Sequence, residues 1–262
     1  MDIPLRPLLN GLDVFLLVFV RMTGLFVIAP IFGRRNIPAY LKIGFSFFLA
    51  VIIVNTVPFK SPGNFENIYV FILLVFKEFI VGITIGYVSY LIFSAIYVAG
   101  QLIDMQIGFG MVNVLDPVSN IQVPITANFY FIISMLVFLS FNGHHVLIKA
   151  LFDSYSIIPL GGAVFNNSLM NHIILIFTDL FVIGFKIAAP IITAILLTDI
   201  TLGIISRTVP QLNVFVVGMP LKIIVGLLIM VITIPAVLSL TQGLVSKMSG
   251  DMFIFIKDMG PK

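Results

Sequence analysis

The sequence predicts an all-α membrane protein, and three observations support this fold class. Of the 262 residues, 60% are hydrophobic and 10% are charged, whereas soluble domains are roughly half apolar and about a quarter charged. The mean hydropathy is +1.19. The apolar residues form long runs without the alternation of apolar and polar positions that a transmembrane barrel requires. We therefore expect helices throughout, in one membrane domain.

Six apolar segments are long enough to cross a bilayer, because a helix needs about 17 to 25 residues to span about 30 Å of hydrocarbon. In chain order they are 8–33, 37–58, 66–99, 122–141, 169–198 and 212–241. The connections between them contain residues that end helices and form turns. Examples in chain order are Asn36, Pro62, Gly108, Gly143 and Pro210.

The third and sixth segments carry further local signals. The third, 66–99, has about 34 residues and would measure on the order of 50 Å as one helix, well beyond the hydrocarbon thickness. It must therefore bend, tilt or leave the membrane, and Gly82 and Gly86 are its expected flexible point. The sixth follows a turn at Pro210, and Asn213 is the expected N-cap of its helix.

Seven ionisable residues lie inside or at the edge of these runs, where each costs roughly 2.5 to 3.5 kcal/mol at the bilayer centre on insertion scales. They are Arg21, Lys42, Lys77, Glu78, Asp179, Lys186 and Lys222. Their side chains must face protein or water. Composition leaves two interpretations open: kinked helices whose charged side chains reach the bilayer surface, or helix faces buried against other subunits.

The sequence gives no support to nucleic-acid binding, thiol chemistry or metal-dependent catalysis. The net charge is +3, but the Lys and Arg residues are scattered and form no basic patch. The absence of cysteine excludes disulfides and thiolate sites. His144 and His145 are adjacent, so they cannot both face one metal from a regular helix, and no nucleophile motif accompanies them. We expect neither catalysis nor a cofactor.

The stretch 99–122 is unusual because it is apolar and yet broken. Gly108 and Gly110 flank Phe109 and end the preceding helix, and Asp116-Pro117 stops the loop that follows. A loop with this composition does not favour open water, so we expect it inside protein or across a channel. The residues alone also allow an ordinary connector that packs into its own bundle.

Several sequence blocks, in a fixed order along almost the whole chain, resemble one known family. They are Ala29-Pro30-Ile31-Phe32, Ile37-Pro38 and Lys42-Ile43-Gly44, then AGQLI, MQIGFG and DPVSN within 99–120, Phe141-Asn142-Gly143-His144, and SRTVPQLNVFVVGMPLKIIVGL at 206–227. In these blocks the chain resembles the FliR family of the bacterial flagellar and type III protein-export apparatus.

The resemblance implies a non-catalytic subunit of the flagellar export gate in the bacterial cytoplasmic membrane, at the flagellar basal body. Its helical hairpins would pack in a multi-subunit helical assembly with FliP-like and FliQ-like subunits, close to an FlhB-like subunit, around a channel for unfolded export substrates. Membrane lipid would be a further partner, whereas nucleic acid would not. The chain would be one export-gate domain, 1–262, with an N-terminal part to about residue 120 and a C-terminal hairpin part from about 121. The resemblance favours subunit burial of the seven charges, or a place in the lumen.

The resemblance also implies that the central loop is the plug of the closed channel. The plug residues would be Gly108, Phe109, Gly110, Met111, Val112, Asn113, Val114, Leu115, Asp116 and Pro117. Glycines would let the backbone fold across a narrow lumen, and the apolar side chains would exclude water. Asp104 departs from the small or apolar residue that the family pattern places just before this loop.

A secondary transporter of small solutes remains the alternative hypothesis. Interrupted helices and the embedded charges Asp179, Lys186 and Lys222 are features of such proteins.

Overall fold

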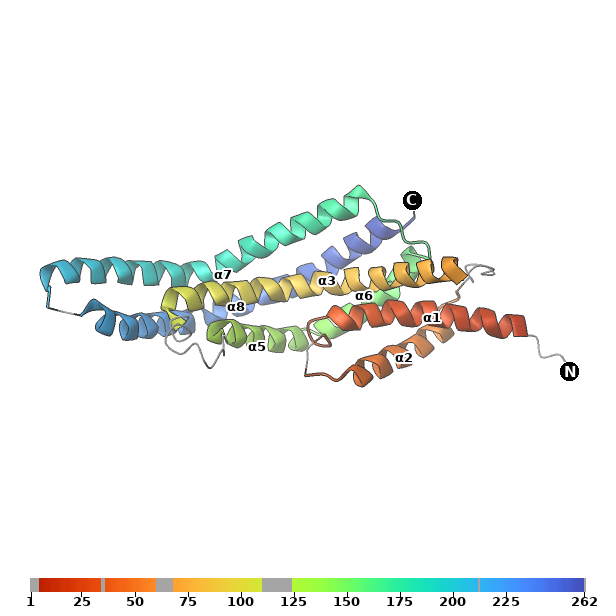
Figure 1. Ribbon diagram of the computed structural model, residues 1–262, viewed down its shortest axis with the longest axis horizontal. Coiled ribbons are helices and arrows are strands. Elements are labelled where there is room, and N and C mark those ends of the chain that lie inside the picture. Colours follow the sequence, from red (N-terminus) through yellow and green to blue (C-terminus); the bar gives the residue numbers. More distant parts are fainter. Residues whose placement is uncertain (1–4, 34–35, 60–67, 110–123, 212, 262) are drawn as a thin grey trace. The chain divides into compact units, whose positions relative to one another are not determined.

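The computed structural model describes residues 5–33, 36–59, 68–109, 124–211 and 213–261. Within these ranges the chain forms α-helices and turns and no strand. The helices are α1 (Leu5–Ile28), α2 (Ala39–Thr56), α3 (Ile68–Ile107), α5 (Ile125–Ser140), α6 (Gly143–Ile157), α7 (Asn167–Thr208) and α8 (Val214–Met259) (Figure 1). Five of the described helices are long and apolar enough to cross a membrane, or six spans if α5 and α6 form one broken span. The predicted all-α membrane fold is confirmed.

Three helices extend beyond the apolar segments that predicted them. α3 continues to Ile107, α7 to Thr208 and α8 to Met259. The added part of α8 is amphipathic, because its buried residues follow a helical spacing of three and four: Met248, Met252, Phe255, Ile256 and Met259. Polar residues in this region therefore lie on the other face of the same helix, which continues beyond the end of the predicted apolar segment at 241.

α6 was not predicted from the sequence. This helix follows α5 after a short turn in which Asn142 adopts a positive φ of 53°, which asparagine tolerates better than most residues. Its buried positions Leu147, Leu151, Ser154 and Tyr155 recur with a helical period. Polar residues between them interrupt the segment, so it is not one of the long apolar runs from which helices were predicted.

The chain forms two compact units, each assembled from separated segments. Unit 1 comprises Met1–Leu91, Asn142–Ile176 and Val245–Lys262, and unit 2 comprises Ile92–Phe141 and Phe177–Leu244. α3, α7 and α8 contribute to both units. The predicted single domain with a division near residue 120 stays a prediction.

Unit 1 holds α1 against α2 and α3. Phe15 and Phe19 of α1 meet Phe47 of α2 edge to face, at centroid distances of 5.3 and 6.2 Å. A Cβ added at Gly82 would overlap the carbonyl oxygen of Arg21, so the backbones of α1 and α3 touch there. α3 runs without interruption through Gly82 and Gly86. The glycines that we expected to be a flexible point instead permit close helix contact.

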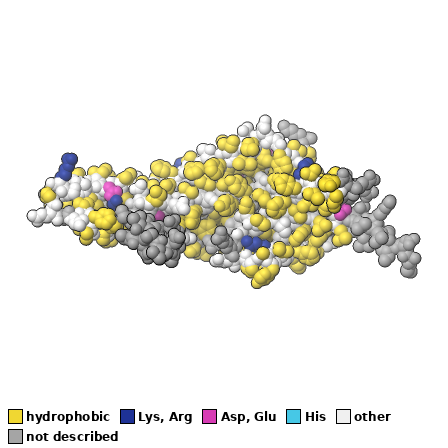
Figure 2. All heavy atoms as spheres, in the orientation of Figure 1, with side chains coloured by type: hydrophobic (Ala, Val, Ile, Leu, Met, Phe, Trp, Pro, Cys, Tyr) yellow, Lys and Arg dark blue, Asp and Glu magenta, His cyan; other side chains and the backbone are white. Residues whose placement is uncertain are grey.

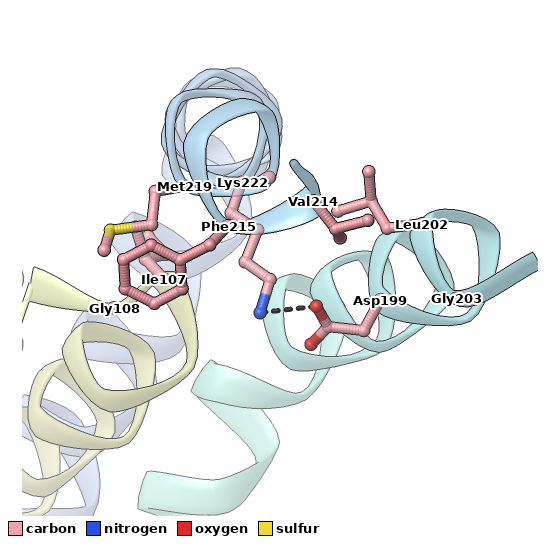
Figure 3. A pocket seen from close by; sticks show the side chains of 10 residues that line it. Ile107, Gly108, Asp199, Leu202, Gly203, Val214, Phe215, Met219 and Lys222 are labelled. Carbon is pink, nitrogen blue, oxygen red and sulfur yellow. Dashed lines mark ion pairs between the residues drawn. The ribbon is translucent and has the colours of Figure 1, made fainter. Parts of the chain in front are cut away.

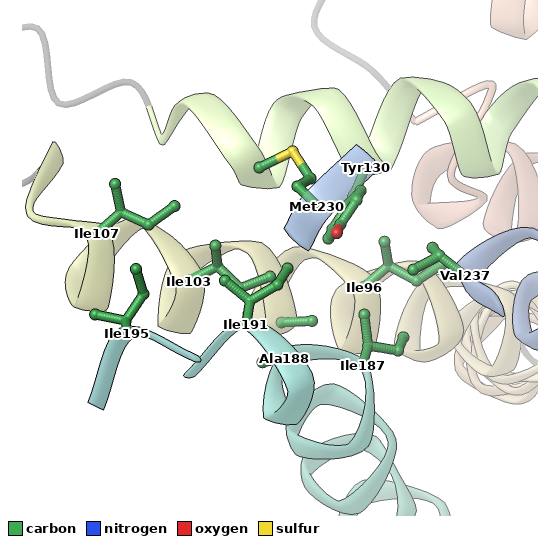
Figure 4. Packing of buried hydrophobic residues seen from close by; sticks show 11 residues of the cluster. Ile96, Ile103, Ile107, Tyr130, Ile187, Ala188, Ile191, Ile195, Met230 and Val237 are labelled. Atoms are coloured by element: carbon green, nitrogen blue, oxygen red, sulfur yellow. The ribbon is translucent and has the colours of Figure 1, made fainter. Parts of the chain in front are cut away.

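The core of unit 2 is an apolar cluster contributed by four helices (Figure 4). Its residues are Ile96, Ala99, Ile103 and Ile107 of α3, Tyr130 of α5, Ile187, Ala188, Ile191 and Ile195 of α7, and Met230 and Val237 of α8. Their spacing of three and four places each set on one helix face. Because lipid tails are as apolar as these side chains, shape and close packing decide how the helices associate.

Candidate functional site

The base of the central loop lies at the end of α3. α3 ends at Ile107, and Gly108 adopts a φ of 96° that favours glycine. Its N–H donates to the carbonyl oxygen of Asp104 at 3.1 Å. Phe109 packs against the apolar cluster of unit 2. The predicted helix break at Gly108 is therefore confirmed.

Most of the predicted plug residues lie outside the described residues. Gly108 and Phe109 are the two plug residues within the described part of the chain. Gly110, Met111, Val112, Asn113, Val114, Leu115, Asp116 and Pro117 lie outside the described residues. The plug role of the loop stays a prediction.

Asp104 caps the helix on the far side of the loop. Its carboxylate oxygens accept the backbone N–H of Thr126 at 2.9 and 3.2 Å, and one of them accepts the N–H of Ala127 at 3.4 Å. The side chain is buried, with Asp104 only 6% exposed. A carboxylate at a helix N-terminus is favoured by the free N–H groups and by the helix dipole. The structure thus gives the Asp104 carboxylate hydrogen-bond partners in the first turn of α5.

The same helix pair is also in direct backbone contact. A Cβ added at Gly100 of α3 would overlap the backbone of Ala127 in α5. The N-cap position of α5 is Pro124, which makes no side-chain capping bond. The sequence shows that α5 starts without its own capping side chain, but it does not show that Asp104 of the neighbouring helix supplies the cap.

A cavity of about 470 Å³ lies next to the loop base in unit 2 (Figure 3). α3, α7 and α8 line it with Ile107, Gly108, Asp199, Leu202, Gly203, Val214, Phe215, Gly218, Met219 and Lys222. Lys222 forms an ion pair with Asp199 across this cavity. Asn213 accepts the N–H groups of Phe215 at 3.1 Å and Val216 at 3.3 Å, so its predicted role as N-cap of α8 is confirmed.

Unit 1 contains a buried ion pair between two of the predicted charges. The Nε of Arg21 in α1 donates to an oxygen of Glu78 in α3 at 2.5 Å, and both side chains are 0% exposed. The other oxygen of Glu78 accepts the N–H of Gly161 at 2.7 Å. Glu78 therefore joins α3 to both α1 and the connection that follows α6.

The remaining hydrogen-bond donors of Arg21 find their acceptors in α6 and at its C-terminal end. Its two terminal nitrogens donate to the hydroxyl of Ser154 at 3.0 Å and to the carbonyl of Ile158 at 3.1 Å. The guanidinium carbon lies 4.3 Å from the centre of the Tyr155 ring, a cation–π distance. This network meets the requirement that a buried charge be paired and hydrogen-bonded.

The other predicted charges do not converge on one site. Lys42, Lys77 and Asp179 are partly exposed, and Lys186 is exposed. No residue within the described ranges forms an ion pair with Lys186. The structure therefore brings together Arg21 with Glu78, and pairs Lys222 with Asp199, an acid that we had not singled out.

The histidines occupy two places in unit 1. His144 and His145 begin α6 with ring centres 4.2 Å apart. His172 of α7 pairs with Asp258 of α8, whose other carboxylate oxygen accepts the hydroxyl of Ser168 at 2.9 Å. In the described ranges, no group of three or more His, Cys, Asp or Glu side chains could hold a metal ion.

Comparison with known proteins gives a match along most of the chain. Residues 12–248 match the family described as bacterial export proteins, family 1. The flagellar biosynthetic protein FliR of Bacillus subtilis (strain 168) is 39% identical over 235 residues, covering 88% of this chain and 90% of that protein. FliR of Escherichia coli (strain K12) is 30% identical over 241 residues, covering 91% of each chain. The resemblance predicted from the sequence blocks is confirmed.

Proposed function

We propose that this chain, which belongs to the FliR family of bacterial export proteins, is a non-catalytic subunit of the flagellar type III export gate. In this role it forms part of the protein-conducting channel in the bacterial cytoplasmic membrane during flagellar assembly. The observation that carries the proposal is the similarity to flagellar biosynthetic proteins FliR over about nine tenths of both chains.

The exposed apolar surface supports an assembly with partner subunits. α7 has 42 residues and α8 has 46, so at 1.5 Å per residue they measure about 63 and 69 Å, twice the thickness of the hydrocarbon core or more. Part of each helix must therefore lie outside the hydrocarbon. Even so, the apolar side chains of Leu197, Ile200 and Ile204 of α7 are about 60% exposed. Figure 2 shows hydrophobic side chains across much of the visible face. FliP-like and FliQ-like subunits, near an FlhB-like subunit, would cover the part that lipid cannot reach.

Lys186 on α7 has no ion pair with another described residue, and this fits the same proposal. Lys186 is exposed among apolar neighbours, of which Phe185 is itself exposed. A charge in such surroundings is stabilised by a partner's carboxylate or by a water-filled lumen. We propose one of these surroundings for Lys186 and for Lys77.

The ends of the central loop support its role as the plug. Gly108 at its start has a backbone conformation suited to a sharp change of direction. Asp104 connects the helix before the loop to the helix after it. Residues 110–123 connect these two helices in the sequence, and the apolar residues among them are suited to excluding water from a closed channel.

The test is ion leakage through the assembled gate. The chain is coexpressed with the FliP-like and FliQ-like proteins of its own organism, and the purified complex is placed in liposomes. Deleting 109–114 should make the closed complex leak ions. A matched variant replaces Phe109, Met111 and Val112 with serine and keeps the loop length, which separates loss of apolar side chains from loss of length.

Two results would contradict the proposal. Ion permeability that is unchanged in both loop variants would remove the plug role. Failure of the chain to copurify with FliP-like and FliQ-like proteins, combined with solute uptake by vesicles that contain this chain alone, would favour the secondary transporter.

A further inference from the structure

Asp104 connects the C-terminal end of α3 to the N-terminal end of α5. Its side chain accepts the N–H groups of Thr126 and Ala127 in the first turn of α5. Its own backbone carbonyl accepts the N–H of Gly108, which closes the last turn of α3. One residue therefore forms hydrogen bonds both in the last turn of α3 and in the first turn of α5.

This cap differs from an ordinary N-cap in its position along the chain. An ordinary cap is the residue directly before the helix, and its side chain satisfies the same N–H groups without involving another helix. In α5 that position is Pro124, which has a φ of −67° and a ψ of 109° and makes no side-chain bond. The acceptor comes instead from a residue 22 positions before Thr126. The α5 N-terminus is thus satisfied only while α3 lies beside it.

Because this connection is buried, water cannot readily take the place of the Asp104 carboxylate. Asp104 is nearly inaccessible to water, and Thr126 is 1% exposed. One turn earlier on α3, the backbone at Gly100 touches Ala127. If the carboxylate were removed, two buried N–H groups would lose their partner.

We propose that Asp104 is a positioning residue that ties the C-terminal end of α3 to the N-terminal end of α5 and so sets their separation. The inference rests on the proposed function, in which these two helix ends carry the plug of the gate. It assigns Asp104 no contact with exported protein. Its role is to hold the two ends where the gate can close.

The first measurement reads the separation of the helix ends without reference to transport. The chain has no cysteine, so Met105→Cys and Ile125→Cys introduce a unique pair for spin labels. Both side chains are exposed, at 74% and 57%. In the assembled complex, Asp104→Ala should lengthen and broaden the distance distribution. Asp104→Asn keeps one acceptor oxygen of the same size and should stay close to the unchanged protein.

The second measurement separates the tie between helices from simple helix capping. Pro124→Ser, combined with Asp104→Ala, gives α5 an N-cap of its own and leaves α3 untied. We expect this double variant to regain the thermal stability that Asp104→Ala loses. We also expect both variants to leak ions faster than the unchanged complex, by about tenfold or more, because both lose the charge-assisted hydrogen bonds that tie α3 to α5.

The outcomes distinguish this inference from the proposed function. Increased leakage in both variants, with a lengthened label distance, supports the positioning role. An unchanged label distance in Asp104→Ala, or full recovery of closure in the double variant, overturns it. If deletion of 109–114 leaks and Asp104→Ala does not, the positioning role is wrong and the gate function stands. If neither leaks, the gate function fails and the positioning role falls with it.

Discussion

Different interactions stabilise the cores of the two units. Unit 1 closes around a buried ion pair, Arg21 with Glu78, whose remaining polar atoms bond to α6 and to the connection that follows it. Unit 2 closes around an apolar cluster, in which Ile103 and Ile191 are fully buried. Its buried acid, Asp104, lies at the edge of that cluster and bonds to a helix end.

This difference bears on how readily each unit can change its packing. A buried ion pair with fixed hydrogen-bond partners has one good arrangement, because any shift leaves a charge unpaired in a medium of low dielectric constant. An apolar cluster has no such directional requirement, and it tolerates exchanges that conserve volume. We therefore expect unit 1 to be the rigid support, whereas unit 2 carries the elements that must adapt around the loop.

The largest expected effect comes from breaking the ion pair of unit 1. Arg21→Met leaves the Glu78 carboxylate buried without its cation, and Glu78→Leu leaves the guanidinium without its anion. Each variant should lose roughly 3–5 kcal/mol of unfolding free energy. Reversible unfolding of the purified chain in mixed detergent micelles measures this loss.

The double variant with Arg21→Met and Glu78→Leu is the control, because it tests whether the loss in the single variants comes from an unpaired buried charge. It removes both charges and should recover a large part of the loss, although the Gly161 N–H and the Ile158 carbonyl lose their partners. Single variants as stable as the unchanged chain would show that the pair does not support unit 1. The contrast between the units would then disappear.

The second effect tests close backbone contact, which both units share. Gly82→Ala in unit 1 and Gly100→Ala in unit 2 each place a methyl group into the backbone of a neighbouring helix. Overpacking of this kind costs about 1–3 kcal/mol, and we expect the larger loss at Gly82, because the shift also disturbs Arg21. Gly44→Ala and Gly243→Ala are matched controls in open space, and each should gain up to about 1 kcal/mol of helix stability. Equal losses at Gly82 and Gly100 would argue that both units are equally rigid.

The features predicted from sequence are those whose signal is local. The long helices follow from apolar runs, the break at Gly108 from its residue type, and the N-cap of α8 from Asn213, which precedes the helix directly. The ion pair of Arg21 and Glu78 joins residues 57 positions apart, and its partners become visible only when helices pack. Asp104 was noticed as an exception, but its bond to α5 depends on a helix contact that no local pattern encodes. α6 was missed because it is less apolar than its neighbours.

A smaller effect tests the expected tolerance of the unit 2 cluster. Ile191→Val removes one methylene from a fully buried side chain and should reduce the unfolding free energy by about 0.5–1.5 kcal/mol. Ile200→Val on the same helix is the control, because Ile200 is exposed and outside the cluster. The same unfolding measurement compares the two variants. A loss at Ile191 as large as that of the ion-pair variants would mean that unit 2 is as intolerant of change as unit 1.

The smallest effect concerns the ion pair between Lys222 and Asp199, which resembles the pair of unit 1 in chemistry and differs in burial. The side chains of Lys222 and Asp199 are 25% and 39% exposed, and pairs open to solvent contribute about 0–1 kcal/mol. A double-mutant cycle with Lys222→Met and Asp199→Leu should therefore give a coupling below about 1 kcal/mol in the purified chain. In the assembled gate the same cycle should give a larger coupling, because a subunit covering the cavity would remove water from the pair. A coupling that is equal in both states would mean that this cavity stays open to water after assembly, and that partner subunits cover other surfaces of unit 2.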